Sequence, residues 1–394
     1  MNDKKEIYLD HVAASPVRKE AIEVMTRLLE DGFGNPQSVH SRGQRAAEVL
    51  AAAREQVASL VGASAYDVIF TATGSEANNM ALKGIARGRA GKSKRVVVSA
   101  IEHHSILTPA KALEKEGFEI VTLGVDGQGL VNLAVLEKAL SGGAAVVSII
   151  HASTEIGTVQ PVAELAALCK GAGVPFHTDS WGAAGMIETD MGKIGAGAMT
   201  IAAQNFGGPP GAAALILGKG FPMRPIIQGG VQERNLRAGQ ENIPAIAGMG
   251  IAAELALSEL EERAARLRPI RDALIEKLPS SIPDVLATGH PEKRLPGHAS
   301  FCVKYIEGEG LLLFLDHNGI MAASGSACTS KALKGSHVLE ALGLDAATAQ
   351  GSIVLTLGDS NSIEDVGTVI EEMKPVVSRL REMSPIYDKN AKDN

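Results

Sequence analysis

The sequence predicts an α/β protein built on a mainly parallel sheet, followed by a smaller α+β domain. Three observations support this prediction. Short β-rich apolar runs alternate with helix-like segments through the first half of the chain, which is typical of a parallel sheet covered on both faces. A long helical stretch covers roughly residues 243–278. After Pro279 the pattern is more mixed, with prolines at Pro283, Pro291 and Pro296 as breakers.

The expected strands are short, apolar and separated by helix-like segments such as Glu76–Arg87 and Val162–Lys170. They are Asp67–Thr71, Arg95–Ala100, Glu119–Val125, Ala144–His151, Val174–Thr178, Ala198–Ala202 and Ala212–Leu217. Sheets of this kind bind ligands at the carboxyl ends of their strands. The residues that follow each run are therefore the first candidates for a functional site.

Composition excludes several classes of partner. The net charge of −7, the 3% aromatic content and the absence of a basic block argue against nucleic acid. No apolar run approaches the ~20 residues of a membrane span, and Met1–Tyr8 has no apolar core of signal-peptide type. We therefore expect a cytoplasmic protein with no membrane partner. Its three cysteines are far apart, which leaves room for one functional thiol, with Cys169 and Cys302 expected in the core.

A first candidate motif is the turn Thr73-Gly74-Ser75, which follows an expected strand and opens a helix. Small residues let the backbone approach an anion, and the helix N-terminus offers free N–H groups with a partial positive charge. These three residues are candidate phosphate ligands. The alternative is an ordinary helix start with Ser75 as the capping residue.

Two further motifs stand at strand ends. In the first, His103 could stack on a bound ring or protonate it, although the alternative is a pair of surface histidines, His103 and His104. In the second, Asp179 could pair with a protonated ring nitrogen. The alternative there is an aspartate that caps the next helix.

The fourth motif is a run of small residues around Cys328, from Ala323 to Ser330. This composition predicts a loop that presents one thiol. A reactive cysteine needs exposure and thiolate character. Cysteine is more often a small buried hydrophobe, but the neighbouring Ser and Gly residues favour the functional interpretation.

Taken together and in this order, these segments resemble the cysteine desulfurases, which are pyridoxal-phosphate enzymes of aminotransferase class V and fold type I. Further matching segments are Tyr8–Asp10, Gly34–His40, Glu155–Gly157 and Leu236–Asn242. The resemblance covers nearly the whole chain, and Ser324–Ser330 is its most specific part.

The resemblance implies a fold. A large domain, residues 13–262, would carry a mostly parallel seven-stranded sheet between helices. A small domain would combine residues 1–12 with residues 263–394. The family is homodimeric, with the pocket at the subunit interface, so Arg237–Asn242 would reach into the pocket of the partner subunit.

The resemblance also implies a chemistry. In the family, a lysine holds pyridoxal phosphate as a Schiff base, and the loop cysteine takes sulfur from L-cysteine as a persulfide while alanine leaves. The persulfide then passes to a partner, often an iron–sulfur scaffold protein. By this resemblance, Ser75, His103 and Asp179 match cofactor contacts, and Cys328 matches the sulfur acceptor.

The sequence departs from the family at the lysine itself. Asn205 stands at the lysine position and Gln204 at the position of the preceding histidine. No lysine occurs between Lys193 and Lys219. Because an amide forms no imine, the resting Schiff base cannot form at this position.

Other family contacts are replaced as well. They involve the phosphate, the ring and the substrate carboxylate, and the residues now present are Ala202, Gln240, Gly182, Thr154, Val354, His11 and Val12. Each lost charge-assisted bond is typically worth ~1.5–3 kcal/mol. Losing three or four would lower the affinity by several powers of ten.

Three functions remain open on the sequence. The first is a desulfurase homologue without normal turnover, acting in iron–sulfur assembly, in which Cys328 relays sulfur or serves as a thiolate ligand to a cluster shared with a scaffold partner. Free sulfide or another donor would then supply the sulfur. The second is a working desulfurase that holds pyridoxal phosphate without a covalent anchor. The third is a pocket rebuilt for another small ligand.

Overall fold

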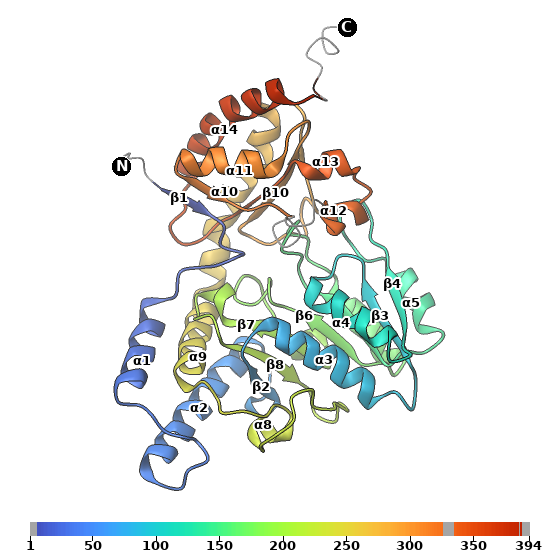
Figure 1. Ribbon diagram of the computed structural model, residues 1–394, viewed down its shortest axis with the longest axis vertical. Helices are drawn as coiled ribbons and strands as arrows, with labels where there is room; N and C mark the ends of the chain where they lie inside the picture. Colours follow the sequence, from blue (N-terminus) through green and yellow to red (C-terminus); the bar gives the residue numbers. More distant parts are fainter. Residues whose placement is uncertain (1–5, 326–334, 386, 388–394) are drawn as a thin grey trace.

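The computed structural model describes residues 6–325, 335–385 and 387 of the 394-residue chain. Cys328, the predicted sulfur acceptor, lies outside these residues. Figure 1 shows a large sheet with its helices in the lower part of the molecule and a smaller sheet with long helices above it. The predicted division at residues 12/13 and 262/263 stays a prediction.

The large sheet has seven strands in the order β2-β8-β7-β6-β5-β3-β4. Only β8 runs antiparallel to its neighbours β2 and β7, so the other six strands point the same way. This confirms the predicted α/β fold with a mostly parallel seven-stranded sheet. The strands are β2 (Val68–Thr71), β3 (Arg95–Ser99), β4 (Glu119–Leu123), β5 (Val146–Ile150), β6 (Phe176–Asp179), β7 (Ala198–Ala202) and β8 (Ala213–Leu217).

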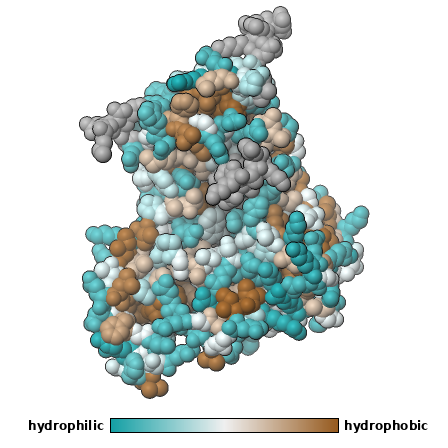
Figure 2. All heavy atoms as spheres, viewed as in Figure 1, coloured by the Kyte–Doolittle hydropathy of each residue, from teal (hydrophilic) through white to brown (hydrophobic). Residues whose placement is uncertain are grey.

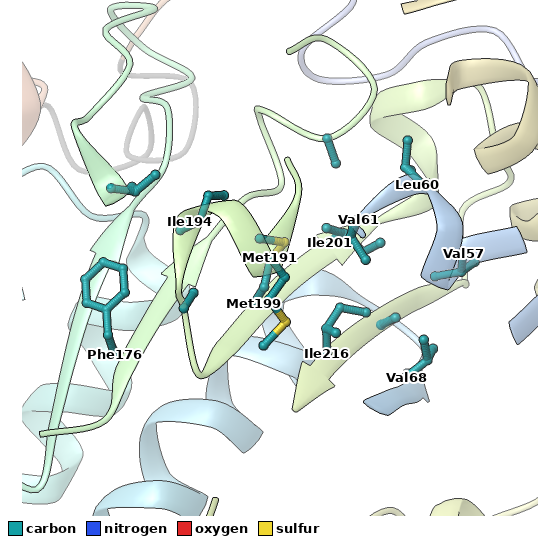
Figure 3. Packing of buried hydrophobic residues seen from close by; sticks show 14 of the residues in the cluster. Val57, Leu60, Val61, Val68, Phe176, Met191, Ile194, Met199, Ile201 and Ile216 are labelled. Carbon is teal, nitrogen blue, oxygen red and sulfur yellow. The ribbon is translucent and has the colours of Figure 1, made fainter. Parts of the chain in front are cut away.

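Helices cover both faces of this sheet because successive strand residues point to opposite faces. Val97 and Val147 pack against one set of helices, while Val96 and Val146 pack against the other. The first set is α2 (Ser41–Leu60), α5 (Leu133–Leu140), α6 (Val162–Gly171) and α9 (Ile243–Ser258), and the second is α3 (Gly74–Gly88) and α4 (His104–Glu114). Figure 3 shows part of the first core, including Val57, Met199 and Ile216.

The upper part is built on a three-stranded antiparallel sheet of order β12-β10-β9 and a parallel pair, β1 with β11. Its strands are β1 (Ile7–Leu9), β9 (Val285–Ala287), β10 (His298–Val303), β11 (Ile320–Ala322) and β12 (Ser352–Thr356). Three helices enclose its own hydrophobic core: α10 (Leu260–Ser281), α11 (Gly308–His317) and α14 (Ile363–Met383). The N-terminal strand therefore packs with the C-terminal third of the chain.

The remaining helical segments are short, apart from α1. They are α1 (Lys19–Glu30), η1 (Ala65–Asp67), α7 (Met191–Ile194), η2 (Ala203–Phe206), α8 (Gln232–Asn235), α12 (His337–Ala341) and α13 (Ala346–Gln350). Two of these segments matter for the candidate site. The segment η2 carries Asn205, and α12 follows the run of residues that contains Cys328.

The prediction of one long helical stretch after residue 243 is wrong. The expected helical stretch over residues 243–278 is two helices, α9 and α10, bent by 70°. The break is at Glu259, whose ψ of 1° departs from helical geometry. Arg18 and Arg263 both bind the Glu259 carboxylate and hold the corner.

Among the described residues, no single helix is long and apolar enough to span a membrane. Only α9 and α10, counted together across their bend, reach the length and apolar composition of a membrane span.

Candidate functional site

Five strand ends meet at one edge of the large sheet. Because β2, β3, β5, β6 and β7 run parallel, the residues that follow them lie along the same edge. The structure thus brings the predicted site residues to this edge, namely Thr73, Gly74, Ser75, His103, Asp179, Gln204 and Asn205.

A hydrogen-bond chain links two of them. Asn78 on α3 donates from Nδ2 to Asp179 Oδ2 at 2.7 Å and to Ser105 Oγ at 2.8 Å. Ser105 Oγ lies 2.7 Å from His103 Nδ1. The other Asp179 oxygen accepts the Trp181 backbone N–H at 3.1 Å. Asp179 and His103 are therefore held in fixed orientations by residues of two different helices.

Burial sets the charges of this pair. It raises the pKa of Asp179 and lowers the pKa of His103, while the attraction between their charged forms acts against both shifts. Nearby, Glu102 is fully buried, and burial raises its pKa to about 8. Glu102 Oε1 accepts from the Ile150 backbone N–H at 2.8 Å, whereas its Oε2 has no partner among the described residues.

The turn before α3 differs from one prediction. The capping residue is Thr73, whose Oγ1 accepts the Glu76 backbone N–H at 3.1 Å, and not Ser75, which is exposed in the first turn. Thr73 is in extended geometry (φ −148°, ψ 157°), as an N-cap requires. Glu76 in turn accepts the Ala72 backbone N–H at 2.8 Å and pairs with Arg237 at 2.8 Å. The ion pair between Glu76 and Arg237 therefore links this turn to the segment that contains Gln240.

Asn205 decides whether the site fits a covalently held pyridoxal phosphate. Its side chain is buried in η2, and its Nδ2 donates to the Ala184 carbonyl oxygen at 3.2 Å. The neighbouring Gln204 is half-buried. The amide at position 205 is thus an internal hydrogen-bonding group and supplies no amine. Asn205 therefore does not fit the role of a covalent anchor for pyridoxal phosphate.

Two apolar groups lie close to the turn before α3. A Cβ placed on Gly74 would lie 3.6 Å from Ala202 Cβ and 3.8 Å from Trp181 Cδ1. Ala202 supplies no hydroxyl, and Trp181 is the single tryptophan of the chain. An apolar methyl group and an indole edge therefore lie against the turn that would hold a phosphate.

A cavity of about 300 Å³ opens on another side of Asn205. Its lining includes the buried His11 and Arg263, together with Asp359. Burial lowers the pKa of His11, and its Nε2 has no partner in the described part of the chain. The lining also includes Arg18 and Lys19, so charged side chains line this cavity together with the imidazole of His11 and the amide of Asn205.

Two cysteines are structural. Cys169 and Cys302 are fully buried, and burial raises the pKa of each thiol to about 12. This confirms the prediction that both belong to the core. Within residues 6–325, 335–385 and 387, no group of three or more His, Cys, Asp or Glu residues could hold a metal ion.

Sequence reasoning missed Asn78, Ser105 and Trp181. Asn78 had a signal, since it is a polar residue on a helix face that is otherwise lined by Ala77 and Ala81. No comparable signal marks Trp181, because its approach to Gly74 depends on how β6 and the turn before α3 are placed in space.

Comparison with known proteins decides the family. The family described as Aminotransferase class-V matches residues 7–368. "Cysteine desulfurase IscS 1" of Archaeoglobus fulgidus is 44% identical over 380 residues, covering 96% of this chain and 99% of the relative. The chain belongs to the cysteine desulfurase family. A second member, "Cysteine desulfurase IscS" of Dictyoglomus turgidum, is 41% identical over 382 residues, covering 97% of each chain.

Solved structures of cysteine desulfurase relatives share the fold. A "NIFS-LIKE PROTEIN" superposes with a TM-score of 0.89 at 31% identity, covering 95% of this chain and all of the other. A NifS-like protein from Rickettsia africae gives a TM-score of 0.86, also at 31% identity, with 95% of this chain and 100% of the other covered. The chain thus shares the fold of these cysteine desulfurase relatives.

Proposed function

We propose that this protein serves sulfur transfer in iron–sulfur cluster assembly without normal desulfurase turnover, with Cys328 as a persulfide carrier or cluster-ligand thiol. The observation that carries the proposal is Asn205, which stands where the family needs an amine and is hydrogen-bonded within the fold. Membership of the cysteine desulfurase family supports the sulfur chemistry.

The cofactor contacts weaken in the same direction. Beside Gly74 stand Ala202, which offers no hydroxyl donor, and the apolar indole edge of Trp181. Each missing charge-assisted hydrogen bond costs about 1.5–3 kcal/mol of binding free energy. Without a covalent anchor, these losses act directly on the affinity for pyridoxal phosphate.

The two roles of Cys328 require different sulfur donors. As a relay, the Cys328 thiolate attacks the outer sulfur of a donor persulfide, the donor leaves as a thiolate, and the transferred sulfur keeps its oxidation state. As a cluster ligand, the thiolate binds iron while sulfide enters the cluster unchanged. Sulfide alone cannot make a persulfide without an oxidant, so a sulfide-fed protein would use Cys328 as a ligand.

Cluster reconstitution tests the proposal. The protein, a scaffold partner, ferrous iron and sulfide are combined without air, and cluster absorbance is followed for the unmodified chain, Cys328→Ala and the control Cys169→Ala. We expect Cys328→Ala alone to lower cluster yield on the complex. Undiminished assembly with Cys328→Ala, for both a sulfide and a persulfide donor, would contradict it.

We also propose a homodimer. Large apolar side chains are exposed on α1 and on the segment that leads to α2: Ile22 is 50% exposed, Leu29 69%, Phe33 63% and Val39 91%. Figure 2 shows hydrophobic atoms gathered over the α1 region. Apolar surface of this kind marks association sites. Light scattering should give twice the chain mass, and a monomer would contradict the proposal.

One observation supports a second candidate function. The chain from Asp179 through Asn78 and Ser105 to His103 would still orient a ring on that side of the site. It favours a working desulfurase with non-covalent pyridoxal phosphate. Alanine production from L-cysteine that depends on added pyridoxal phosphate would favour this alternative.

A further inference from the structure

A cavity of about 410 Å³ lies at the edge of the large sheet opposite the candidate site. Its walls come from the connections that lead into β6 and β7, from the turn after β8 and from the end of α6. Phe176, the first residue of β6, lines the cavity, whereas Asp179, the last residue of the same strand, belongs to the candidate site. The two sites are therefore at opposite ends of one strand.

Most of the cavity wall is apolar, and part of it is built on glycine. The apolar lining residues are Ala166, Val174, Pro175, Phe176, Phe221 and Pro222. The Phe221 ring has room because Gly197 carries no side chain, since a Cβ there would lie 1.6 Å from Phe221 Cζ. A Cβ on Gly173, Gly195 or Gly220 would meet nothing within 4 Å, so these lining residues border open space. Such a wall favours a ligand with an apolar body.

The charge of the lining is entirely positive. Its charged side chains are those of Arg89 and Lys170, and it includes no Asp or Glu. Arg89 is half-buried and Lys170 is exposed. Neither cation pairs with a carboxylate among the described residues. A cavity lined by one sign of charge attracts a ligand of the other sign, so this lining favours an anion.

Two hydrogen-bond donors at the cavity are held in place by the fold. Arg89 Nη2 donates to the Gly173 carbonyl oxygen at 3.0 Å, which fixes the guanidinium beside the connection between α6 and β6. Arg89 Nε is buried and has no partner within the described chain. The backbone N–H of Ala196, a lining residue that is 8% exposed, likewise finds no acceptor in the part of the chain that the structure describes. Because a buried N–H without an acceptor is costly, both groups favour a ligand that accepts hydrogen bonds.

We propose that this cavity binds a small organic carboxylate, with the carboxylate at Arg89 and Ala196 and the apolar body against the wall that includes Phe176 and Phe221. A carboxylate has two oxygens, which matches two fixed donors. A phosphate monoester has a third terminal oxygen and a larger charge, and the lining offers only the exposed Lys170 for them. The proposal goes beyond sulfur transfer, because no residue of this cavity belongs to the candidate site.

Ligand-observed NMR titration tests the proposal on the full chain. Three probes share an aromatic ring and differ in the attached group: benzoate, phenyl phosphate and the neutral benzyl alcohol. The proteins compared are the unmodified chain, Arg89→Gln and the control Arg87→Gln. Arg87 stands two residues earlier at the end of α3, pairs with Glu116 at 2.7 Å and does not line the cavity. Both substitutions therefore remove one positive charge from the same helix end.

The unmodified chain and Arg87→Gln should bind benzoate alike, and Arg89→Gln should bind it about tenfold more weakly or worse, as loss of a charged hydrogen bond implies. Benzoate should bind more tightly than either other probe. Equal benzoate affinity of Arg89→Gln and the unmodified chain would overturn the site. Tighter binding of phenyl phosphate would overturn the choice of carboxylate, and equal affinity for all three probes would show apolar contact alone and overturn both.

Lys170→Glu supplies a second variant that leaves the buried structure untouched, because this side chain is exposed. It should weaken benzoate binding and leave benzyl alcohol binding unchanged, a difference that a disturbed fold would not produce. Equal benzoate binding by Lys170→Glu and the unmodified chain would contradict the proposal. None of these titrations uses iron, a sulfur donor or a partner, so their failure and the failure of cluster assembly are distinguishable.

Discussion

Asn205 carries a side-chain amide that is hydrogen-bonded inside the fold. Its bond to the Ala184 carbonyl oxygen and its burial in η2 make it part of the local structure. Ala202 and Trp181 lie against the turn at Gly74, where we propose that the family phosphate contact has been lost. A single substitution therefore should not recreate the family site.

The first prediction concerns recovery of cofactor binding. Asn205→Lys alone should show little visible absorbance from bound pyridoxal phosphate, because the new ammonium is buried without a partner and the phosphate contacts are still missing. Adding Ala202→Ser, Gln204→His and Gln240→Thr should restore binding by about a hundredfold or more. An absorbance titration measures both. Equal affinity of the single and the quadruple variant would contradict the account.

At the scale of elements, a strained segment braces the strand edge. Glu233, Arg234 and Asn235 all have positive φ, at 44°, 58° and 63°, which is costly for non-glycine residues. Glu233 holds the segment in place, because it is buried and accepts a two-pronged pair from Arg54 at 2.9 and 2.6 Å. It also accepts the Phe70 backbone N–H on β2 at 2.8 Å.

The second prediction follows from that pair. Glu233→Ala should lower the free energy of unfolding by about 3–5 kcal/mol, because it leaves a largely buried guanidinium and a strand N–H without their acceptor. Urea unfolding followed by circular dichroism measures the change. The control is Glu188→Ala, which breaks the exposed pair with Lys193 and should have no measurable effect. Similar effects of the two substitutions would contradict the prediction.

The elements themselves were largely predictable. Strand β7 matches its expected range at both ends, and the other six strands of the large sheet differ by at most two residues at either end, because buried parallel strands are short apolar runs between breakers. The bend at Glu259 was not predictable, since it depends on Arg18 and Arg263, one of them far away in sequence. The pair Glu155 and Ser336 is likewise a contact between distant segments.

The candidate site was predictable in position and less so in detail. Thr73, His103 and Asp179 do lie at strand ends, as the strand pattern indicates. The wrong capping residue, Ser75 in place of Thr73, arose because both hydroxyls suit an N-cap and only the backbone geometry distinguishes them. Asn78 and Ser105, which connect Asp179 to His103, required the packing of α3 beside α4.

At the scale of the whole molecule, buried ionisable groups make stability depend on pH. Burial lowers the pKa of His151 to about 4 and of His177 and His298 to about 3. It raises the pKa of Glu102 to about 8 and of Glu155 to about 7. In the unfolded chain, each histidine takes up a proton when the pH falls below its ordinary pKa. Each carboxyl loses its proton when the pH rises above its ordinary pKa.

The third prediction is a stability maximum at about pH 6.5, where the two opposing effects balance. Below it, the histidines favour the unfolded chain as pH falls. Above it, the folded chain keeps protons on the two carboxyls that the unfolded chain has already lost, so stability falls as pH rises and levels off above about pH 8. Melting temperatures between pH 4 and 9 measure this, and Glu102→Gln should flatten the alkaline side. A melting temperature that rises steadily to pH 9 would contradict the prediction.

The central claim is that this cysteine desulfurase homologue does not turn over L-cysteine by the family route. The most direct test is the visible absorption spectrum of protein purified without air, before and after adding pyridoxal phosphate and L-cysteine, with alanine measured in the same samples. We predict no band from bound cofactor and no catalytic formation of alanine. A cofactor band together with alanine release at many turnovers per chain would contradict the account and make the protein a working enzyme.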